Sequence, residues 1–190
     1  MNLLRLGLVV SAFVLFGAGS ALAAPAKKAP IDPQLTPAAN QAFLAANAKK
    51  PGTIIKPSGL QYRILHNGYG ARPHASDYVT VYYTGALING SVFDGTEPGM
   101  PARFKVNSLI PGWAEALTLM RVGDHWQIVI PSNMAYGERG AGESVPPNQT
   151  LVFDVELMKV VPPKKRPVGP NDDPDKVDDN QDLGPDDSGN

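Results

Sequence analysis

Residues 110–120 read I-P-G-W-A-E-A-L-T-L-M, and the rest of the chain is organised around them. Apolar side chains recur in it at helical spacing and would form one buried stripe. The stripe consists of Trp113, Ala116, Leu117 and Met120. A proline in second place suits a first helical turn, where the missing N–H costs nothing. The stretch therefore predicts a helix of about three turns.

Runs in which apolar and polar residues alternate lie on both sides of this helix, as is typical of half-buried strands. They lie at residues 60–65, 78–83, 102–106, 126–130 and 151–158. Asn89-Gly90 adds a two-residue turn signal before a further strand at Val92. The sequence therefore predicts an α+β fold, in which an antiparallel half-barrel sheet of five or six strands wraps around one short α-helix. Trp113 would sit at the open end of the core.

The first 24 residues have the pattern of a signal peptide. Arg5 precedes an apolar run over residues 6–16, and small residues with an A-x-A pattern follow. The run is shorter than the ~20 residues that span a membrane, so we expect a cleaved signal rather than a retained anchor. This predicts an exported, periplasmic protein with no membrane span after cleavage. Secretion or attachment to the cell surface is the alternative.

The segments on either side of the β-rich domain at 58–161 differ from it in composition. Residues 25–57 read as a linker and a short helix over Thr36–Lys50, which carries few large apolar residues. We expect a solvated lead-in helix on a monomer, with pairing to a second chain as the alternative. Residues 162–190 hold many aspartates and almost no apolar residues, which predicts a disordered acidic tail.

Composition excludes several classes of function. A formal net charge of -1 gives no electrostatic support for a nucleic-acid partner. The chain has no cysteine and therefore no thiol chemistry. Its three histidines lie without metal-ligand spacing, and neither a G-x-S-x-G motif nor a phosphate-binding loop is present. We expect neither a metal nor a cofactor.

Short blocks, each weak alone, follow one another in a distinctive order. They read V-Y-Y-T-G at 81–85, V-F-D-G at 92–95, I-P-G-W at 110–113, M-R-V-G at 120–123, A-Y-G at 135–137 and V-P-P-N-Q-T-L-V-F-D-V-E-L at 145–157. Together they resemble the FKBP-type peptidyl-prolyl isomerases, the binding proteins of the macrolides tacrolimus and rapamycin. The residues leading into the domain resemble the bacterial Mip-like branch of that family.

The resemblance implies roles for particular residues. The catalytic residues would be Tyr83, Asp94 and Tyr136. The residues that bind substrate would be Phe93, Leu109, Ile110, Trp113, Val145 and Phe153. In this arrangement Trp113 is the pocket floor, Asp94 hydrogen-bonds near Tyr83, and Tyr136 offers its hydroxyl to a substrate carbonyl. Ala102 stands where many members have a further aromatic wall, which would alter the binding of macrolides.

The implied activity is rotation about X-Pro bonds, as a rotamase that assists the folding of exported, proline-containing polypeptides without covalent catalysis. The alternative is a periplasmic chaperone or surface binding module that holds such segments with little turnover. Both would use an apolar pocket. The presence of Asp94 and Tyr136 favours the enzyme, because a binder needs only the apolar walls.

Overall fold

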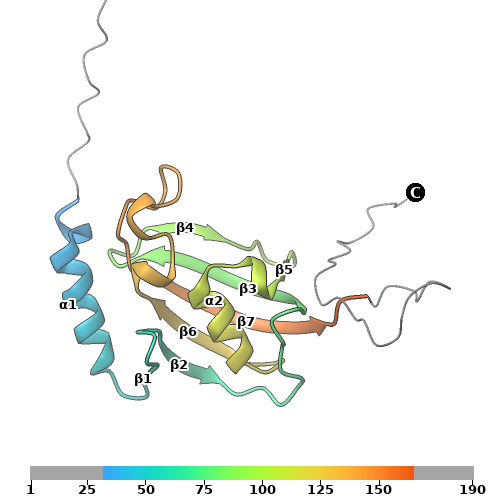
Figure 1. Ribbon diagram of the computed structural model, residues 1–190. Helices are drawn as coiled ribbons and strands as arrows, with labels where there is room; N and C mark the ends of the chain where they lie inside the picture. The colour runs from blue at the N-terminus through green and yellow to red at the C-terminus, as the bar shows by residue number, and fades with distance from the viewer. Residues whose placement is uncertain (1–31, 165–190) are drawn as a thin grey trace, which may run out of the picture. The chain divides into compact units, whose positions relative to one another are not determined.

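The computed structural model describes residues 32–164, and their centre is one antiparallel sheet with a helix against one face (Figure 1). The strands are β1 (Ile54–Ile55), β2 (Gln61–His66), β3 (Tyr78–Leu87), β4 (Val92–Gly95), β5 (Ala102–Lys105), β6 (His125–Ile130) and β7 (Leu151–Val161). The helices are α1 (Pro37–Ala48) and α2 (Pro111–Leu119), with short 3-10 turns at Pro33–Leu35, Val106–Ser108, Ser132–Met134 and Gly137–Arg139. The order in the sheet is β1-β2-β6-β7-β3-β4, and β5 also pairs with β3.

The predicted fold class is confirmed, but the sheet has seven strands rather than five or six. The additional strand is β1, which pairs with the start of β2. Two residues are too few to show an alternating pattern, so the sequence carries no signal for this strand.

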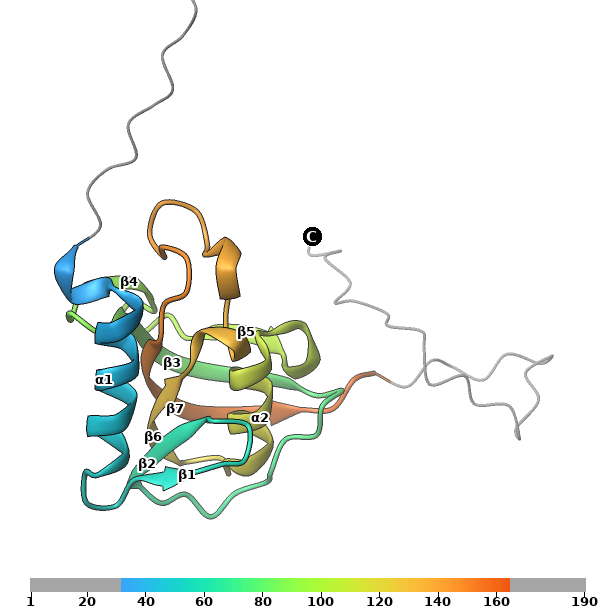
Figure 2. The same cartoon turned by 60° about the vertical axis from the view of Figure 1, so that its left-hand side comes forward.

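Helix α2 lies across one face of the sheet and places its apolar stripe in the core (Figures 1 and 2). All four stripe residues are buried, as the periodicity predicts. The helix lies close to β6, since a Cβ on Gly112 would come within 2.4 Å of Cγ2 of Ile130. This close approach fixes where the next residue, Trp113, enters the core.

The hairpin between β3 and β4 forms at Asn89-Gly90, but with a longer loop than the two-residue turn expected. The N–H of Leu87 bonds to the carbonyl of Ser91 at 2.9 Å, which leaves a three-residue loop. Only Gly90 in this loop has a positive φ, of 89°. A three-residue loop with glycine in the left-handed region is the next most common hairpin connection.

Helix α1 corrects the expectation of a solvated lead-in helix. Its N-cap is Thr36, whose side chain accepts a hydrogen bond from the N–H of Ala39. One face is nevertheless buried against the domain through Asn40 and Asn47. The carboxamide of Asn47 donates to Oε1 of Gln61 at 2.9 Å. Asn40 and Asn47, seven positions apart, therefore dock α1 on the domain. The sequence had suggested that this polar face is exposed to water.

Two predicted segments fall outside the described residues. These are the signal peptide at 1–24 and all but the first three residues of the acidic tail at 162–190. Within residues 32–164, neither helix has the length and apolar character needed to cross a membrane.

Candidate active site

A pocket of about 250 Å³ opens at the N-terminal end of α2. It is lined by Tyr83, Asp94, Phe104, Ser108, Leu109, Ile110, Trp113, Tyr136 and Phe153. Seven of these nine residues were expected from the sequence, although they come from five separate segments of the chain. The fold thus brings together all three expected catalytic residues and four of the six expected to bind substrate.

Trp113 lies at the centre of the aromatic residues around this pocket and is only 4% exposed. Its ring meets those of Tyr83 and Phe153 at centroid distances of 5.3 Å, with interplanar angles of 87° and 84°. Such edge-to-face contacts each add about 0.5–1.5 kcal/mol to the burial of the rings. The indole is therefore held rigidly and forms an apolar floor.

The two remaining expected residues support the pocket without lining it. Phe93 packs edge-to-face on Phe153, with centroids 5.6 Å apart. Val145 is buried in the core and pairs with Ala141 within the long loop between β6 and β7. Gly85 makes the Phe93–Phe153 contact possible, because a Cβ there would lie 2.6 Å from Cε1 of Phe153.

Phe104 is a pocket residue that the sequence reasoning missed. Its ring lies 5.8 Å from Tyr83 and 6.2 Å from Trp113, centroid to centroid. The aromatic wall expected to be missing at Ala102 is therefore supplied two residues later on the same face of β5. Alternation along β5 was the signal that could have identified it.

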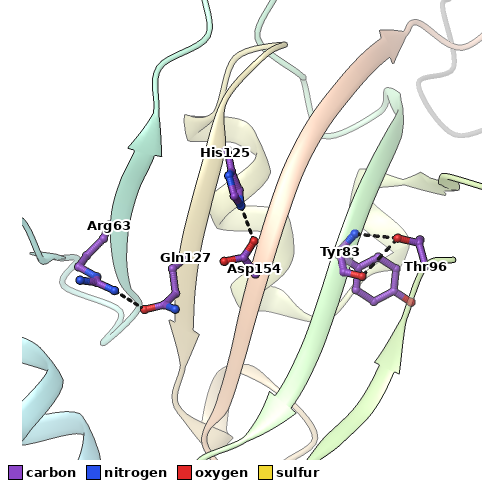
Figure 3. Close-up of polar contacts among 6 residues, drawn as sticks. All are labelled: Arg63, Tyr83, Thr96, His125, Gln127 and Asp154. Atoms are coloured by element: carbon purple, nitrogen blue, oxygen red, sulfur yellow. Dashed lines mark hydrogen bonds and ion pairs between the residues drawn. The ribbon is translucent and has the colours of Figure 1, made fainter. Parts of the chain in front are cut away.

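The hydroxyl of Tyr83 donates a hydrogen bond to Oδ2 of Asp94 at 2.7 Å. The side chain of Thr96 holds the backbone of Tyr83 in place. Its hydroxyl accepts from the N–H of Tyr83 at 3.1 Å and also lies 3.3 Å from the Tyr83 carbonyl (Figure 3). The carboxylate of Asp94 is thereby held at the pocket wall. Polar contacts in the rest of the sheet, Arg63 with Gln127 and His125 with Asp154, lie on other strands.

Burial and the Asp94 charge act together on the two tyrosine hydroxyls. Burial, followed by the hydrogen bond to Asp94, raises the pKa of Tyr83 well above its ordinary value. The pKa of Tyr136 is also raised, first by burial and then by the negative charge of Asp94. Both hydroxyls therefore keep their protons throughout the physiological range and remain hydrogen-bond donors.

Two donors at the pocket have no acceptor in the described part of the chain. They are the hydroxyl of Tyr136, which is 39% exposed as a residue, and the backbone N–H of Ile110. Both belong to residues that line the pocket. The site thus combines apolar aromatic walls with two free donors, an arrangement suited to holding an uncharged carbonyl-bearing ligand.

Comparison with known proteins finds the same family along most of the described chain. Residues 70–158 match the family model of the FKBP-type peptidyl-prolyl cis-trans isomerases, and residues 23–64 match the model of the domain amino terminal to them. The Legionella longbeachae "Outer membrane protein MIP" is 52% identical over 124 residues, which cover 65% of this chain and 53% of that protein. The Escherichia coli "FKBP-type 22 kDa peptidyl-prolyl cis-trans isomerase" is 55% identical over 120 residues, covering 63% and 58%.

A solved structure extends this similarity to the fold. The crystal structure of a peptidyl-prolyl cis-trans isomerase from Pseudomonas syringae superposes with a TM-score of 0.62 at 39% identity, covering 65% of this chain and 92% of that one. The chain spans little more than half the length of the two curated relatives. The chain matches the isomerase family model and covers nearly all of the solved chain. It therefore belongs to the family of FKBP-type peptidyl-prolyl cis-trans isomerases.

Proposed function

We propose that this chain is a peptidyl-prolyl cis-trans isomerase that accelerates rotation about X-Pro bonds in proline-containing polypeptides. The observation that carries the proposal is the position of Tyr136 and Asp94 beside an aromatic pocket with Trp113 as its floor. Membership of the family supports it. The reaction breaks no bond, and the groups that line this pocket can promote it without a nucleophile.

The chemistry follows from the amide bond itself. Rotation about an X-Pro bond meets a barrier of ~18–20 kcal/mol, because the C–N bond has partial double-bond character. The twisted amide has lost resonance and much of its dipole, so an apolar pocket favours it over the planar form. Removing about 4 kcal/mol from the barrier would accelerate rotation roughly a thousandfold.

The polar residues would hold the substrate in an orientation in which its X-Pro bond can rotate. The proline ring would lie on the indole of Trp113, and the free donors of Tyr136 and Ile110 would bind flanking carbonyls. The carboxylate of Asp94, fixed by Tyr83 and by the N–H of Gly95 at 2.9 Å, would place a negative field at the pocket wall.

The test is refolding of a protein whose slow phase is limited by a non-native X-Pro isomer, with catalytic amounts of this chain. We expect the slow phase to accelerate in proportion to the amount added. Asp94→Ala and Tyr136→Phe should reduce turnover while the affinity for a proline-containing peptide holds. Tyr69→Phe is the matched control, since Tyr69 is 92% exposed and lies outside the pocket.

The same assay separates the enzyme from a chaperone or surface binding module. A binding module would bind the peptide but leave the slow phase unchanged. In that case Asp94→Ala and Tyr136→Phe would lower the affinity for the peptide, and neither the parent chain nor the variants would show turnover.

We also propose that macrolide inhibitors bind this pocket. Phe104 replaces the aromatic wall that Ala102 lacks, so rapamycin should compete with substrate. Acceleration that rapamycin abolishes would support this part of the proposal. Acceleration that rapamycin leaves intact would show that the rim formed by residues 94–101 excludes the drug.

The working form we propose is an exported monomer with four segments: a signal peptide at 1–24, a linker and helix at 25–57, an isomerase domain at 58–161 and an acidic tail at 162–190. The signal pattern of the first segment supports export, as does similarity to a relative named as an outer membrane protein. The docking of α1 on its own domain supports the monomer, because the Asn40 and Asn47 face is occupied. N-terminal sequencing after export and sedimentation equilibrium test these two points.

A further inference from the structure

A second, larger groove lies at the opposite end of α2 from the isomerase pocket. It has a volume of about 770 Å³ and shares no lining residue with the pocket around Trp113. Its walls come from β2, β6, the end of α2 and the segment that leaves β2. The proposed isomerase reaction makes no use of this groove.

The floor of the groove is aromatic and apolar. Trp126 stacks on Tyr62 with ring centroids 4.4 Å apart and planes at 6°, and Ile64 and Leu119 lie beside them. Trp126 is 3% exposed, and its indole N–H has no acceptor among the described residues. An unmet buried donor is costly, so a carbonyl or carboxylate that reached this group would gain a hydrogen bond.

The rim of the groove is positively charged. Arg72 and Arg121 are both exposed, and neither forms an ion pair within residues 32–164. The nearby Asp124 offsets part of this charge, but its carboxylate is buried and accepts from the backbone N–H groups of Gly68 and Arg121, so the two guanidinium groups remain the exposed charges of the rim. A ligand that matches this groove has carboxylates on either side of an apolar side chain.

The same chain contains a segment of this composition. Residues 171–190 hold eight aspartates and one lysine, and their only large apolar residues are Val177 and Leu183. Both stand within two residues of an aspartate. We propose that this acidic segment binds the groove of its own chain, with Val177 or Leu183 on the Trp126 floor and neighbouring aspartates at Arg72 and Arg121.

The connection between the segment and the groove is short enough. Strand β7 passes the groove, since the N–H of Leu157 bonds to the carbonyl of Asp124 at 2.9 Å. The described chain ends seven residues later at Lys164, about 23 Å further if it is extended. The 13 residues from there to Val177 span up to about 43 Å, so they can lead back. A short tether gives an effective concentration in the millimolar range, at which weak contacts suffice.

The test attaches a nitroxide to the segment and reads its position from the NMR spectrum of the exported chain. The sequence has no cysteine, so Asn180→Cys provides a single labelling site between Val177 and Leu183. We expect selective broadening of the Trp126 indole N–H and of the backbone amides of Tyr69 and Arg72. The broadening should fade between 0.1 M and 1 M salt, as the screening length falls from about 10 Å to about 3 Å.

Charge variants make the test specific. The double variant Arg72→Gln/Arg121→Gln should abolish the selective broadening. The control Arg139→Gln/Lys159→Gln removes the same charge elsewhere, including a residue of β7 close to where the segment leaves the domain, and should preserve it. The amide spectrum of each variant reports whether the domain remains folded.

Three results would overturn the proposal. The first is uniform or absent broadening, and the second is broadening that persists in the Arg72/Arg121 variant. The third comes from a mixture of two samples, in which one set of chains carries the nitroxide and the other is isotope-enriched and carries none. Broadening in the isotope-enriched chains would assign the contact to a second copy. None of these readouts depends on isomerase turnover.

Discussion

The carboxamide nitrogen of Asn40 lies 3.1 Å from Oε1 of Gln149 and joins two buried residues that stand 109 positions apart in the sequence. Oδ1 of Asn40 also accepts from the backbone N–H of Thr150 at 2.7 Å, and Nε2 of Gln149 donates to the carbonyl of Leu35 at 3.0 Å. Helix α1 is thus fastened to the end of the long loop that carries Tyr136.

Asn40→Ala should destabilise the domain by about 2–3 kcal/mol, because it leaves the Thr150 N–H and Oε1 of Gln149 buried without a partner. Urea unfolding measures the loss. Gln41→Ala is the matched control, since the next residue of the helix is exposed. Equal stabilities for the two variants would mean that α1 contributes nothing to holding the loop.

Trp113→Phe should lower isomerase turnover about tenfold, equivalent to roughly 1.4 kcal/mol in the barrier, because the smaller ring no longer forms the whole pocket floor. Trp126→Phe is the comparison, since both indoles are buried but Trp126 lies in the other groove. It should cost stability and leave turnover unchanged. The refolding assay checks both variants, and similar losses of turnover would indicate a general effect of core packing.

Asp94→Asn should bring the pKa values of Tyr83 and Tyr136 down towards the ordinary value of 10.0, because the negative charge that opposes tyrosinate is removed. Burial remains, so both should stay above that value. Alkaline titration of tyrosinate absorbance measures the change, with Tyr83→Phe and Tyr136→Phe assigning the signals. An unchanged titration would show that Asp94 does not act on these hydroxyls.

The raised pKa of Tyr83 also predicts a dependence of stability on pH. In the unfolded chain this hydroxyl ionises near pH 10, whereas in the folded protein it keeps its proton to higher pH. Its stabilising contribution is therefore complete below pH 10 and is lost as the pH rises above that value. The stability difference between the parent chain and Tyr83→Phe should narrow above pH 10 in urea unfolding. A constant difference would contradict the shift.

Gly85→Ala should weaken the aromatic wall, because the added Cβ would lie 2.6 Å from Cε1 of Phe153 and 2.9 Å from Cζ of Phe93. Overpacking of this kind typically costs about 1–3 kcal/mol. Turnover should fall together with stability, since Phe153 lines the pocket. Thr84→Ala, at the exposed neighbouring position, is the control. Thermal unfolding and the refolding assay supply the two readouts.

Local sequence patterns were enough to predict helix α2, most of the strands and the family. Periodicity suffices for these elements because each buries one face, and a buried face must repeat at the period of its own backbone. The blocks around Tyr83, Asp94 and Tyr136 indicated the pocket residues through resemblance, and seven of the nine lining residues follow from it.

The docking of α1, the pocket wall at Phe104 and the groove at Trp126 became visible in the folded chain. Asn40 and Asn47 look solvated in the sequence, because a polar side chain becomes a core residue only when distant partners such as Gln149 and Gln61 satisfy it. Phe104 reaches the pocket through the pairing of β5 with β3, and the groove forms where α2 ends over β2 and β6. These features depend on contacts between segments far apart in the chain, which local patterns do not encode.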